Sequence, residues 1–380
     1  MKYSKHLKAL ILSCGTGGGH NAAAEAVKEQ FEKNGHETVL MNPYELKSKK
    51  LAESINNIYI KSVQTAPGIF GKVYKLGEIY RKLPGRSPVY YINKKIAVLL
   101  YEYIRKEQFD IIVMSHLFPA EILTYIRLHG GMLPQTIYIA TDYACIPFTE
   151  ETICDKYVIP AKSLKYEFES HGIEETQLSF AGIPVKAAFR ENITKQEAIQ
   201  TLKLNPQRRY ILIEGGSVGA GNIKRIVQLL YEKYHDSVYK LIVVCGKNTK
   251  LFDELWKRYE NAVIILKYVD NLHMYMKASD MFITKGGGLS STEAAVSGIP
   301  IIHVTPIPGC ETKNCRFFSR SGMSIWVKNP QKQLIPSMEK LMDGKRSSVM
   351  KDRQQSIINR EAAEDICELA ENMVSQIHMK

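Results

Sequence analysis

Residues 281–314 read MFITKGGGLSSTEAAVSGIPIIHVTPIPGCETKN, and this stretch decides the fold. An apolar run, Met281–Thr284, leads into three glycines at 286–288. A helix of small residues is expected over 290–296, and a second apolar run, Ile301–Val304, follows it. A strand, a glycine loop, a helix and another strand in this order are typical of a parallel α/β unit.

The same stretch predicts a site for an anion. A glycine loop lets backbone N–H groups approach a phosphate closely, and the start of the next helix carries about half a positive charge. Two carboxylates, Glu293 and Glu311, flank the second strand and suit hydroxyl groups of the same ligand. The alternatives are that Glu293 only complements the helix dipole and that Glu311 is a surface-loop residue.

Working outward, strand and helix signals alternate twice along the 380 residues, which predicts two α/β domains. Expected strands are 7–12, 38–41, 111–115 and 136–140, then 210–213, 241–245 and 263–266. We expect an N-terminal domain at 1–185, a linker at 186–208, a C-terminal domain at 209–350, and a helical segment at 351–380 that packs back on the N-terminal domain. The fold class is two Rossmann-like, doubly wound α/β domains.

The composition limits the kinds of binding partner and the cellular compartment that suit this chain. The net charge of +12 indicates nucleic acid, an anionic membrane surface or a phosphorylated substrate, unless the chain is simply a basic soluble protein. The seven cysteines are scattered without a C-x-x-C pair, which argues against a structural zinc site and fits a reduced, cytoplasmic chain. The first apolar run continues into a glycine loop, so we interpret it as a strand and not as a signal peptide. No apolar stretch approaches the roughly 20 residues of a membrane helix, so membrane contact is expected to be peripheral.

The first glycine loop, CGTGGGHN at residues 14–21, follows the first expected strand. It lacks the lysine of a P-loop, and Asn42 stands where a dinucleotide site needs an acidic residue, so we set aside ATP and NAD. His20 lies at the expected helix start, where its pKa should fall and favour a neutral general base; the alternative is an exposed histidine without a role. Asp142 follows a strand at the carboxyl edge of the sheet, where ligands bind, or it is a cap or turn residue.

A second loop, GGSVGA at residues 215–220, also lies between a strand and a helix. Ser217 can donate a hydrogen bond to a phosphate, although a compact turn is the alternative. Two such loops in one domain favour a nucleotide diphosphate there.

Residues 57–106 hold ten Lys and Arg against two Glu, a net +8 of the chain's +12, with tyrosines and aliphatic residues between them. This mixture suits anionic lipid headgroups, with about 1 kcal/mol per basic residue at such a surface. Nucleic acid or a solvated helical face are the alternatives. The residues expected at the membrane surface are Lys72, Lys75, Arg81, Lys82 and Arg86.

At this point the motifs resemble a known family. The run from Thr284 to Glu293, the later Gly298-Ile299-Pro300 and Pro308-Gly309-Cys310-Glu311, and GGGH at 17–20 resemble glycosyltransferase family 28, above all its processive diacylglycerol glucosyltransferases and monogalactosyldiacylglycerol synthases. The loop at 215–220 is more similar to that of MurG in the same family. The resemblance implies two Rossmann-like domains facing a cleft, the GT-B arrangement.

The resemblance also implies roles for individual residues. The C-terminal domain would bind a UDP-sugar, and His20, with Asp142, would lie on the acceptor side. Chemistry in this family inverts the anomeric centre without a metal or other cofactor. The implied donor contacts are the uracil at Tyr268 and Val269, the diphosphate at Gly216, Ser217, Gly287, Gly288, Leu289 and Ser290, the ribose at Glu293, and the hexose at Glu311 and Asn314.

The leading hypothesis is therefore an inverting hexosyltransferase from a UDP-sugar to diacylglycerol or glycosyl-diacylglycerol, peripheral to the cytoplasmic face of the cell membrane and without a nucleic-acid partner. A MurG-like transferase for another lipid-linked acceptor is the alternative enzyme. A UDP-sugar-binding regulator without turnover is the alternative from another class. Cys310 and Thr312 depart from the usual lipid-enzyme motif and would suit a regulator, whereas His20, Glu293 and Glu311 favour an enzyme.

Overall fold

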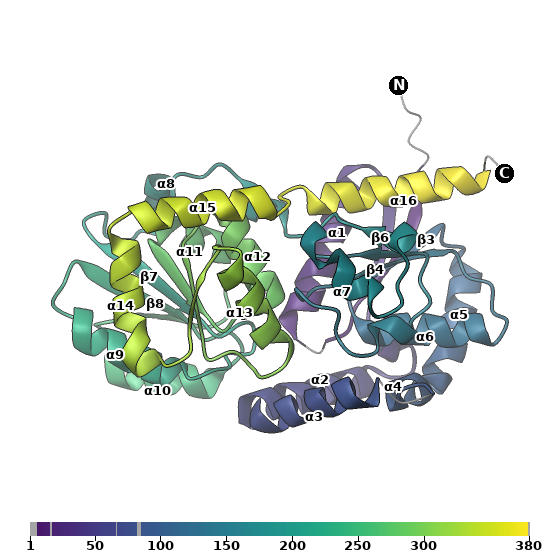
Figure 1. The fold of residues 1–380 in the computed structure, drawn as a ribbon, viewed down its shortest axis with the longest axis horizontal. Helices are drawn as coiled ribbons and strands as arrows, with labels where there is room; N and C mark the ends of the chain where they lie inside the picture. Colours follow the sequence, from purple (N-terminus) through teal and green to yellow (C-terminus); the bar gives the residue numbers. More distant parts are fainter. Residues whose placement is uncertain (1–5, 16, 66, 82–84, 379–380) are drawn as a thin grey trace. The chain divides into compact units, whose positions relative to one another are not determined.

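The computed structural model describes residues 6–15, 17–65, 67–81 and 85–378. The chain divides into two compact units, each a parallel sheet covered by helices (Figure 1). The N-terminal unit comprises Met1–Lys61, Gly71–Ala187 and Asn359–Lys380, and the C-terminal unit comprises Ser62–Phe70 and Ala188–Ile358. Most of the expected linker, including α8 (Lys195–Thr201), thus belongs to the C-terminal unit.

The sheet of the N-terminal unit is parallel throughout and has the strand order β2-β1-β3-β4-β5-β6. Its strands are β1 (Lys8–Leu12), β2 (Glu37–Met41), β3 (Ile111–Met114), β4 (Gln135–Ile139), β5 (Lys156–Val158) and β6 (Leu178–Ser179). The order reverses between β1 and β3, and ligands bind at such switch points. The loop that carries His20 leaves β1 at this position.

The main helices of the N-terminal unit include several that the sequence pattern did not resolve. They are α1 (Gly18–Lys33), α2 (Lys49–Thr65), α3 (Pro67–Tyr80), α4 (Pro88–Ile92), α5 (Lys94–Glu107), α6 (Leu117–Leu128) and α7 (Lys165–Glu169). The end of α2 and the start of α3, within Ser62–Phe70, are counted with the C-terminal unit. The basic stretch forms most of α2 to α5. Its helical nature is clearest in α5, where Ile96, Leu100 and Ile104 are buried one turn apart and Gln108 ends the helix in the left-handed conformation.

The helix α16 (Ala362–His378) belongs to the N-terminal unit although it follows the C-terminal one in sequence. It runs beside α1 in Figure 1. Its residues Ile366, Cys367, Ala370, Met373 and Val374 recur at helical spacing and enter the core that also contains Val27 and Phe31 of α1. The imidazole of His36 lies 2.8 Å from the Glu371 carboxylate and adds a polar contact at the same interface.

The C-terminal unit has a second parallel sheet, with the order β12-β11-β10-β7-β8-β9. Its strands are β7 (Arg209–Glu214), β8 (Tyr239–Val244), β9 (Ile264–Leu266), β10 (Met281–Thr284), β11 (Ile301–Val304) and β12 (Ile325–Val327). The helices after α8 are α9 (Ile223–Tyr234), α10 (Thr249–Tyr259), α11 (Leu272–Ala278), α12 (Gly288–Ser297), α13 (Cys310–Arg320), α14 (Pro330–Met342) and α15 (Lys345–Ile357). The order reverses between β7 and β10, so the loops after these two strands meet at the switch point.

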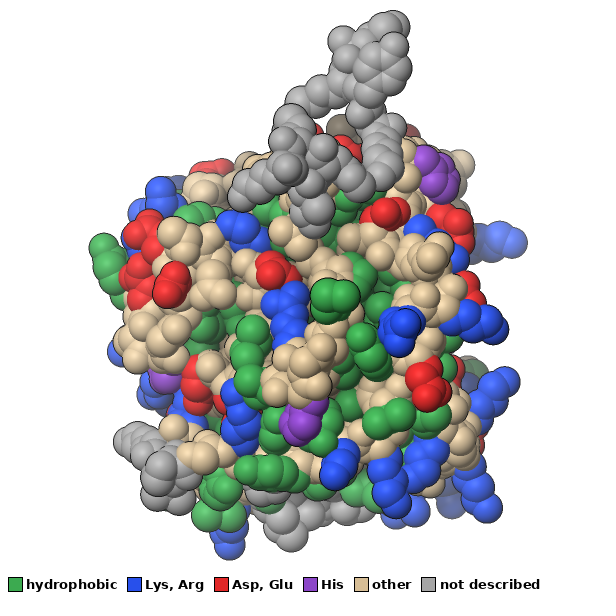
Figure 2. All heavy atoms as spheres, turned by 90° about the vertical axis from the view of Figure 1, so that its right-hand side faces the viewer, with side chains coloured by type: hydrophobic (Ala, Val, Ile, Leu, Met, Phe, Trp, Pro, Cys, Tyr) green, Lys and Arg blue, Asp and Glu red, His purple; other side chains and the backbone are tan. Residues whose placement is uncertain are grey.

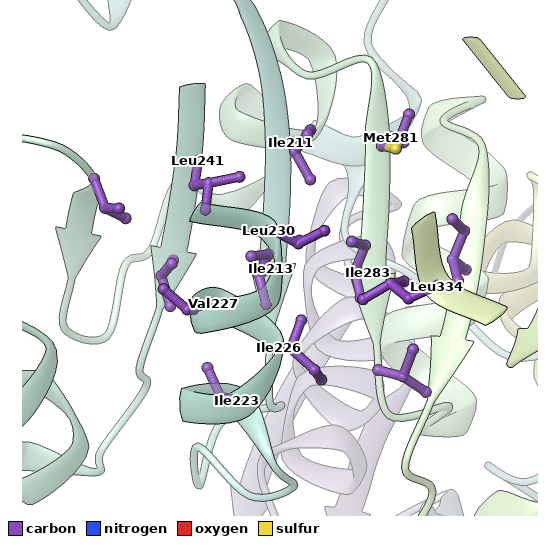
Figure 3. Packing of buried hydrophobic residues seen from close by; sticks show 14 of the residues in the cluster. Ile211, Ile213, Ile223, Ile226, Val227, Leu230, Leu241, Met281, Ile283 and Leu334 are labelled. Carbon is purple, nitrogen blue, oxygen red and sulfur yellow. The ribbon is translucent and has the colours of Figure 1, made fainter. Parts of the chain in front are cut away.

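The core of the C-terminal unit explains why these strands read as continuous apolar runs. Figure 3 shows Ile211 and Ile213 of β7 and Ile283 of β10 packed against Ile226 and Leu230 of α9, and all five are at most 2% exposed. Strands covered on both faces bury every side chain, so no alternation of polar residues is needed. In the described part of the chain, no helix is long and apolar enough to cross a membrane.

We predict that Ile366→Ala destabilises the N-terminal unit by about 2–5 kcal/mol, because it removes a fully buried side chain of α16 from that core. The measurement is urea unfolding followed by circular dichroism. The exposed Glu368→Ala on the same helix is the control and should unfold as the wild type does.

Both tryptophans, Trp256 and Trp326, lie in the C-terminal unit, so their fluorescence should report an unchanged transition in Ile366→Ala. An equal shift of the transition in both signals would show that the two units unfold together, whereas an unchanged transition in both would contradict the place of Ile366 in the N-terminal core.

Candidate active site

The loops after β7 and β10 lie against each other at the switch point of the C-terminal unit. A Cβ atom on Gly216 would lie 2.8 Å from Cε of Lys285, and Gly216 also has a positive φ of 70°. This position needs a left-handed backbone and has no space for a side chain, and only glycine satisfies both conditions. The predicted phosphate loop is therefore in direct contact with the side chain of Lys285, the first residue after β10.

The loop that contains Ser217 is held by the loop that follows β8. A Cβ atom on Gly219 would lie 2.1 Å from the Cys245 carbonyl oxygen, and Gly219 also has a positive φ. The Lys247 N–H donates to the Ser217 carbonyl at 2.9 Å, and Asn248 Nδ2 donates to the Gly219 carbonyl at 3.0 Å. These contacts fix the backbone around the half-buried Ser217 before any ligand arrives.

The start of α12 presents backbone N–H groups at the same edge of the sheet. Gly287 is its N-cap, no side chain caps the helix, and Gly288, Leu289 and Ser290 form its first turn. Such an end suits an anion, because the first N–H groups of a helix have no partner within it. Glu293 lies on the same helix and is 7% exposed.

A buried ion pair lies beside these loops. Lys285 Nζ contacts the Glu311 carboxylate, and the two side chains are only 11% and 8% exposed. The other carboxylate oxygen of Glu311 accepts the Ile307 N–H at 2.8 Å. Burial alone would lower the pKa of Lys285, but Glu311 outweighs this effect and the pKa lies above its usual value, so the lysine is charged.

Glu214, at the end of β7, is a second carboxyl group beside Lys285. Burial raises its pKa to about 7, while the charge of Lys285 and a hydrogen bond from Ser290 act in the opposite direction. The site therefore contains one carboxyl group that titrates near neutrality and one, Glu311, that is committed to an ion pair. Sequence reasoning missed Glu214 and Lys285 as site residues; the available signal was that each charged residue ends or directly follows an apolar strand.

Asn314 is buried and donates from Nδ2 to the Gly286 carbonyl at 3.1 Å. A Cβ atom on Gly286 would lie 2.3 Å from Sγ of Cys315, one residue further along α13. The glycine loop is thus packed directly on α13. Tyr268 and Val269 follow β9, the edge strand two positions from β7, where Tyr268 is 55% exposed and Val269 is half-buried.

In the N-terminal unit, His20 lies in the first turn of α1, next to the chain that leaves β3. Its Nδ1 atom is 2.9 Å from the Ser115 carbonyl oxygen and 2.8 Å from Oγ1 of Thr141. A carbonyl oxygen only accepts, so Nδ1 donates and carries the proton of the neutral ring. Nε2 then bears the lone pair that can accept a proton from a substrate hydroxyl.

Burial lowers the pKa of His20, while the Asp142 charge and the Ser115 carbonyl oppose this effect. The neighbouring His116, at a ring-centroid distance of 4.5 Å, has a pKa lowered well below its usual value by burial and by His20. His20 is consequently neutral near pH 7. Sequence reasoning missed Ser115, His116 and Thr141, which follow β3 and β4 at the same edge of the sheet.

The residues expected at the membrane surface divide into two groups. Lys72 and Lys75 are exposed on α3, whereas Arg86 is half-buried and its Nη1 donates to the Glu151 carbonyl at 2.7 Å. The Arg81 side chain is only 4% exposed and binds both oxygens of Glu150, at 2.7 and 2.6 Å. Arg81 therefore corrects the expectation: its charge is satisfied inside the unit and does not face a membrane. Lys82 lies outside the described residues.

Two Rossmann-like units, each with a parallel sheet and loops of this kind, are the building blocks of the GT-B fold. Accordingly, the fold resembles that of MurG from Acinetobacter baumannii, with a TM-score of 0.61 and 13% identity over 96% of this chain and 99% of that chain.

Residues 20–185 match the monogalactosyldiacylglycerol (MGDG) synthase family, and residues 210–369 match the glycosyltransferase family 28 C-terminal domain. The first half of the chain is thus similar to MGDG synthases and the second half to glycosyltransferase family 28. The chain is also 28% identical to the processive diacylglycerol beta-glucosyltransferases of Bacillus licheniformis, over 92% of this chain and 90% of that protein, and of Bacillus subtilis, over 88% and 87%.

We predict that Glu214→Gln changes the pH dependence of stability. In the unfolded chain the carboxyl group ionises near pH 4.5, but in the folded unit it stays protonated up to about pH 7. Below 4.5 the wild type and the variant should differ least. Between 4.5 and 7 the wild type should lose stability relative to the variant, because only its unfolded state ionises, and above 7 the difference should be constant.

Urea unfolding followed by tryptophan fluorescence measures this difference. The exposed Glu260→Gln is the control and should follow the wild-type profile. A difference between wild type and Glu214→Gln that does not grow with pH would show that Glu214 is not held neutral.

Proposed function

We propose that this protein transfers a hexose from a UDP-sugar to diacylglycerol, or to a glycosyl-diacylglycerol, with inversion at the anomeric carbon. The match of residues 20–185 to the MGDG synthase family and of residues 210–369 to the family 28 C-terminal domain carries this proposal. The neutral His20 and the rigid anion-binding loops are the features that such a reaction requires.

In this proposal the C-terminal unit holds the donor. The diphosphate binds the loop at Gly216 and Ser217 and the first turn of α12, from Gly287 and Gly288 to Leu289 and Ser290. Glu293 accepts hydrogen bonds from the hydroxyl groups of the ribose. Glu311 and Asn314 face the hexose. Tyr268 and Val269 contact the uracil. Charge that develops on the departing UDP is stabilised by these backbone N–H groups and by the helix end, without a metal ion.

The acceptor is activated by His20. Nε2 takes the proton from the acceptor hydroxyl as its oxygen attacks the anomeric carbon, and the bond from that carbon to the UDP oxygen breaks. The Ser115 carbonyl and Thr141 hydroxyl at Nδ1 hold the ring in the tautomer that this step needs. Asp142 is the nearby charge that favours the protonated ring formed in the step.

We predict that His20→Ala lowers glycolipid formation by about 10²–10⁴-fold, since it removes the base, and leaves the affinity for UDP unchanged. The measurement is glycolipid formation in diacylglycerol vesicles with a panel of UDP-sugars, together with UDP binding by calorimetry. The exposed His129→Ala is the control and should retain wild-type activity. Because the pKa of His20 lies below 6.5, kcat/KM in the wild type should not fall until the pH is below that value. UDP release without glycolipid would contradict a lipid acceptor.

A surface of the N-terminal unit suits attachment to an anionic membrane. On α3, Val73, Leu76, Ile79 and Tyr80 are 36–63% exposed, and the exposed Lys72 and Lys75 lie on the same face of the helix. Exposed apolar side chains rimmed by lysines are typical of a helix that lies in the headgroup layer. On the face drawn in Figure 2, Lys and Arg side chains also gather along the lower edge with hydrophobic side chains between them.

We predict that Lys72→Glu combined with Lys75→Glu weakens binding to anionic vesicles about tenfold or more, since each basic residue contributes about 1 kcal/mol at such a surface and the new carboxylates are repelled. Co-sedimentation with vesicles that contain phosphatidylglycerol measures this. The control exchanges the exposed Lys250 and Lys257 of the C-terminal unit for Glu, at equal change in net charge. Equal binding by both double variants would discard α3 as the membrane surface.

A further inference from the structure

The N-terminal unit contains a cavity of about 310 Å³ at the carboxyl ends of β1 and β2, between α1 and α2. This volume lies at the small end of the roughly 300–1,000 Å³ found for small-molecule sites. Its polar lining consists mainly of three carboxamides and three carboxylates, those of Asn21, Asn42, Asn56, Glu25, Glu45 and Glu53. The proposed reaction, as described so far, uses none of them.

The lining excludes several kinds of ligand. Among the described residues no Lys, Arg or His lines the cavity, and the nearby Lys186 is paired with Glu25, so the lining itself offers no positive charge to a phosphate or a carboxylate. Within the described part of the chain, the one group of three metal-ligating side chains close enough to share an ion is His36, Cys367 and Glu371, which lies outside the cavity. The three cavity carboxylates are therefore spread around the space and do not converge on a cation. Carboxylates and amides spread in this way match a ligand with several hydroxyl groups.

The carboxamide groups of the three asparagines differ in which of their atoms already have hydrogen-bond partners. Oδ1 of Asn42 accepts the Tyr44 N–H at 3.2 Å, and Oδ1 of Asn21 accepts the Ser13 hydroxyl at 2.6 Å, so the N–H₂ group of each amide is the part that can donate to a ligand. Oδ1 of Asn56 is buried and has no hydrogen-bond partner among the described residues.

The glycine loop allows Asn56 to occupy this position. A Cβ atom on Gly15 would lie 3.2 Å from Cγ of Asn56, closer than ordinary packing permits. Glu25 on α1 is anchored at the cavity by an ion pair with Lys186. Asn21 directly follows His20 in the first turns of α1, so the cavity begins one residue from the proposed base.

We propose that this cavity binds a hexose ring and, resting on the proposed function, that the ring is the headgroup sugar of a glycosyl-diacylglycerol acceptor. A headgroup held there keeps an already glycosylated lipid in the N-terminal unit, next to His20, and so favours addition of a further sugar over release. The hydroxyl groups of the ring donate to the carboxylates, and its oxygens accept from the amides of Asn21 and Asn42.

The first test does not depend on turnover. Methyl β-D-glucoside is titrated into the full chain, and binding is followed by saturation-transfer NMR. We expect saturable binding that weakens about tenfold or more in Asn56→Leu, because the variant replaces a carboxamide of the lining with a branched apolar side chain. Asn57→Leu is the matched control: Asn57 is the exposed neighbour on α2, outside the lining, and its variant should bind as the wild type does.

Absence of saturable binding to the wild type, or equal affinity in Asn56→Leu and Asn57→Leu, would overturn the proposal. Displacement of the glucoside by Ca²⁺ would also overturn it, because the cavity would then be a cation site. A circular-dichroism melt of each variant shows whether a loss of binding arises from unfolding, and Glu53→Gln, an isosteric change, gives a second variant of the same cavity.

The second test compares acceptors. For Asn56→Leu, kcat/KM should fall about tenfold more with glucosyl-diacylglycerol than with diacylglycerol, whereas Asn57→Leu should leave both values unchanged. An equal fall with both acceptors would contradict a headgroup site. Transfer to neither acceptor by the wild type would refute the proposed function, while the glucoside titration would still decide whether the cavity binds a hexose.

Discussion

The buried ion pair between Lys285 and Glu311 is the interaction on which the arrangement of the donor site depends. Lys285 is the first residue after β10, and Glu311 lies in the first turn of α13. The pair therefore joins the two segments that flank α12 and β11 in sequence. Two charges are tolerated away from water only when each is matched, and Glu311 is matched a second time by the Ile307 N–H. Loss of either partner would leave the other buried and unpaired, so the two positions constrain each other.

The glycines next to this pair are constrained by close packing. Gly286 has no space for a Cβ atom because Cys315 occupies it, and Gly216 has none because Lys285 does. A loop held in this way does not have to be ordered when an anion binds, so no binding energy is lost to that ordering. Glycines that suggest flexibility in the sequence are thus tightly packed at Gly286 and Gly216.

Much of the fold could be predicted from the sequence because buried parallel strands are visible as apolar runs. Four strands of the first sheet and five of the second were recognisable as such runs, whereas the short strands β5, β6 and β12, of two or three residues each, were not. The helices of the basic stretch were not, since their buried positions are masked by the lysines and tyrosines between them. The pairing of Arg81 with Glu150 was also out of reach, because it joins residues 69 positions apart whose proximity only the folded chain establishes.

The candidate site shows the same limit. Glycine loops and the carboxylates Glu293 and Glu311 carry local sequence signals, so their edge of the sheet was identified. The position of Lys285 directly after an apolar strand was a local signal, but its pairing with Glu311, 26 residues later, was not visible in the sequence, and neither was the contact of His20 with the Ser115 carbonyl. Sequence reasoning therefore found groups that belong to a local motif and missed those defined by a distant partner.

The position of α16 has a consequence for how the molecule forms. The core of the N-terminal unit includes Ile366 and Ala370, which the ribosome adds after every residue of the C-terminal unit. Domains usually fold in the order in which they are synthesised. In this chain the second unit has its whole sequence available while the first still exposes the apolar faces of β1 and α1. The half that is made first is thus the half that is completed last, and its unfinished surface needs protection for almost the whole time of synthesis.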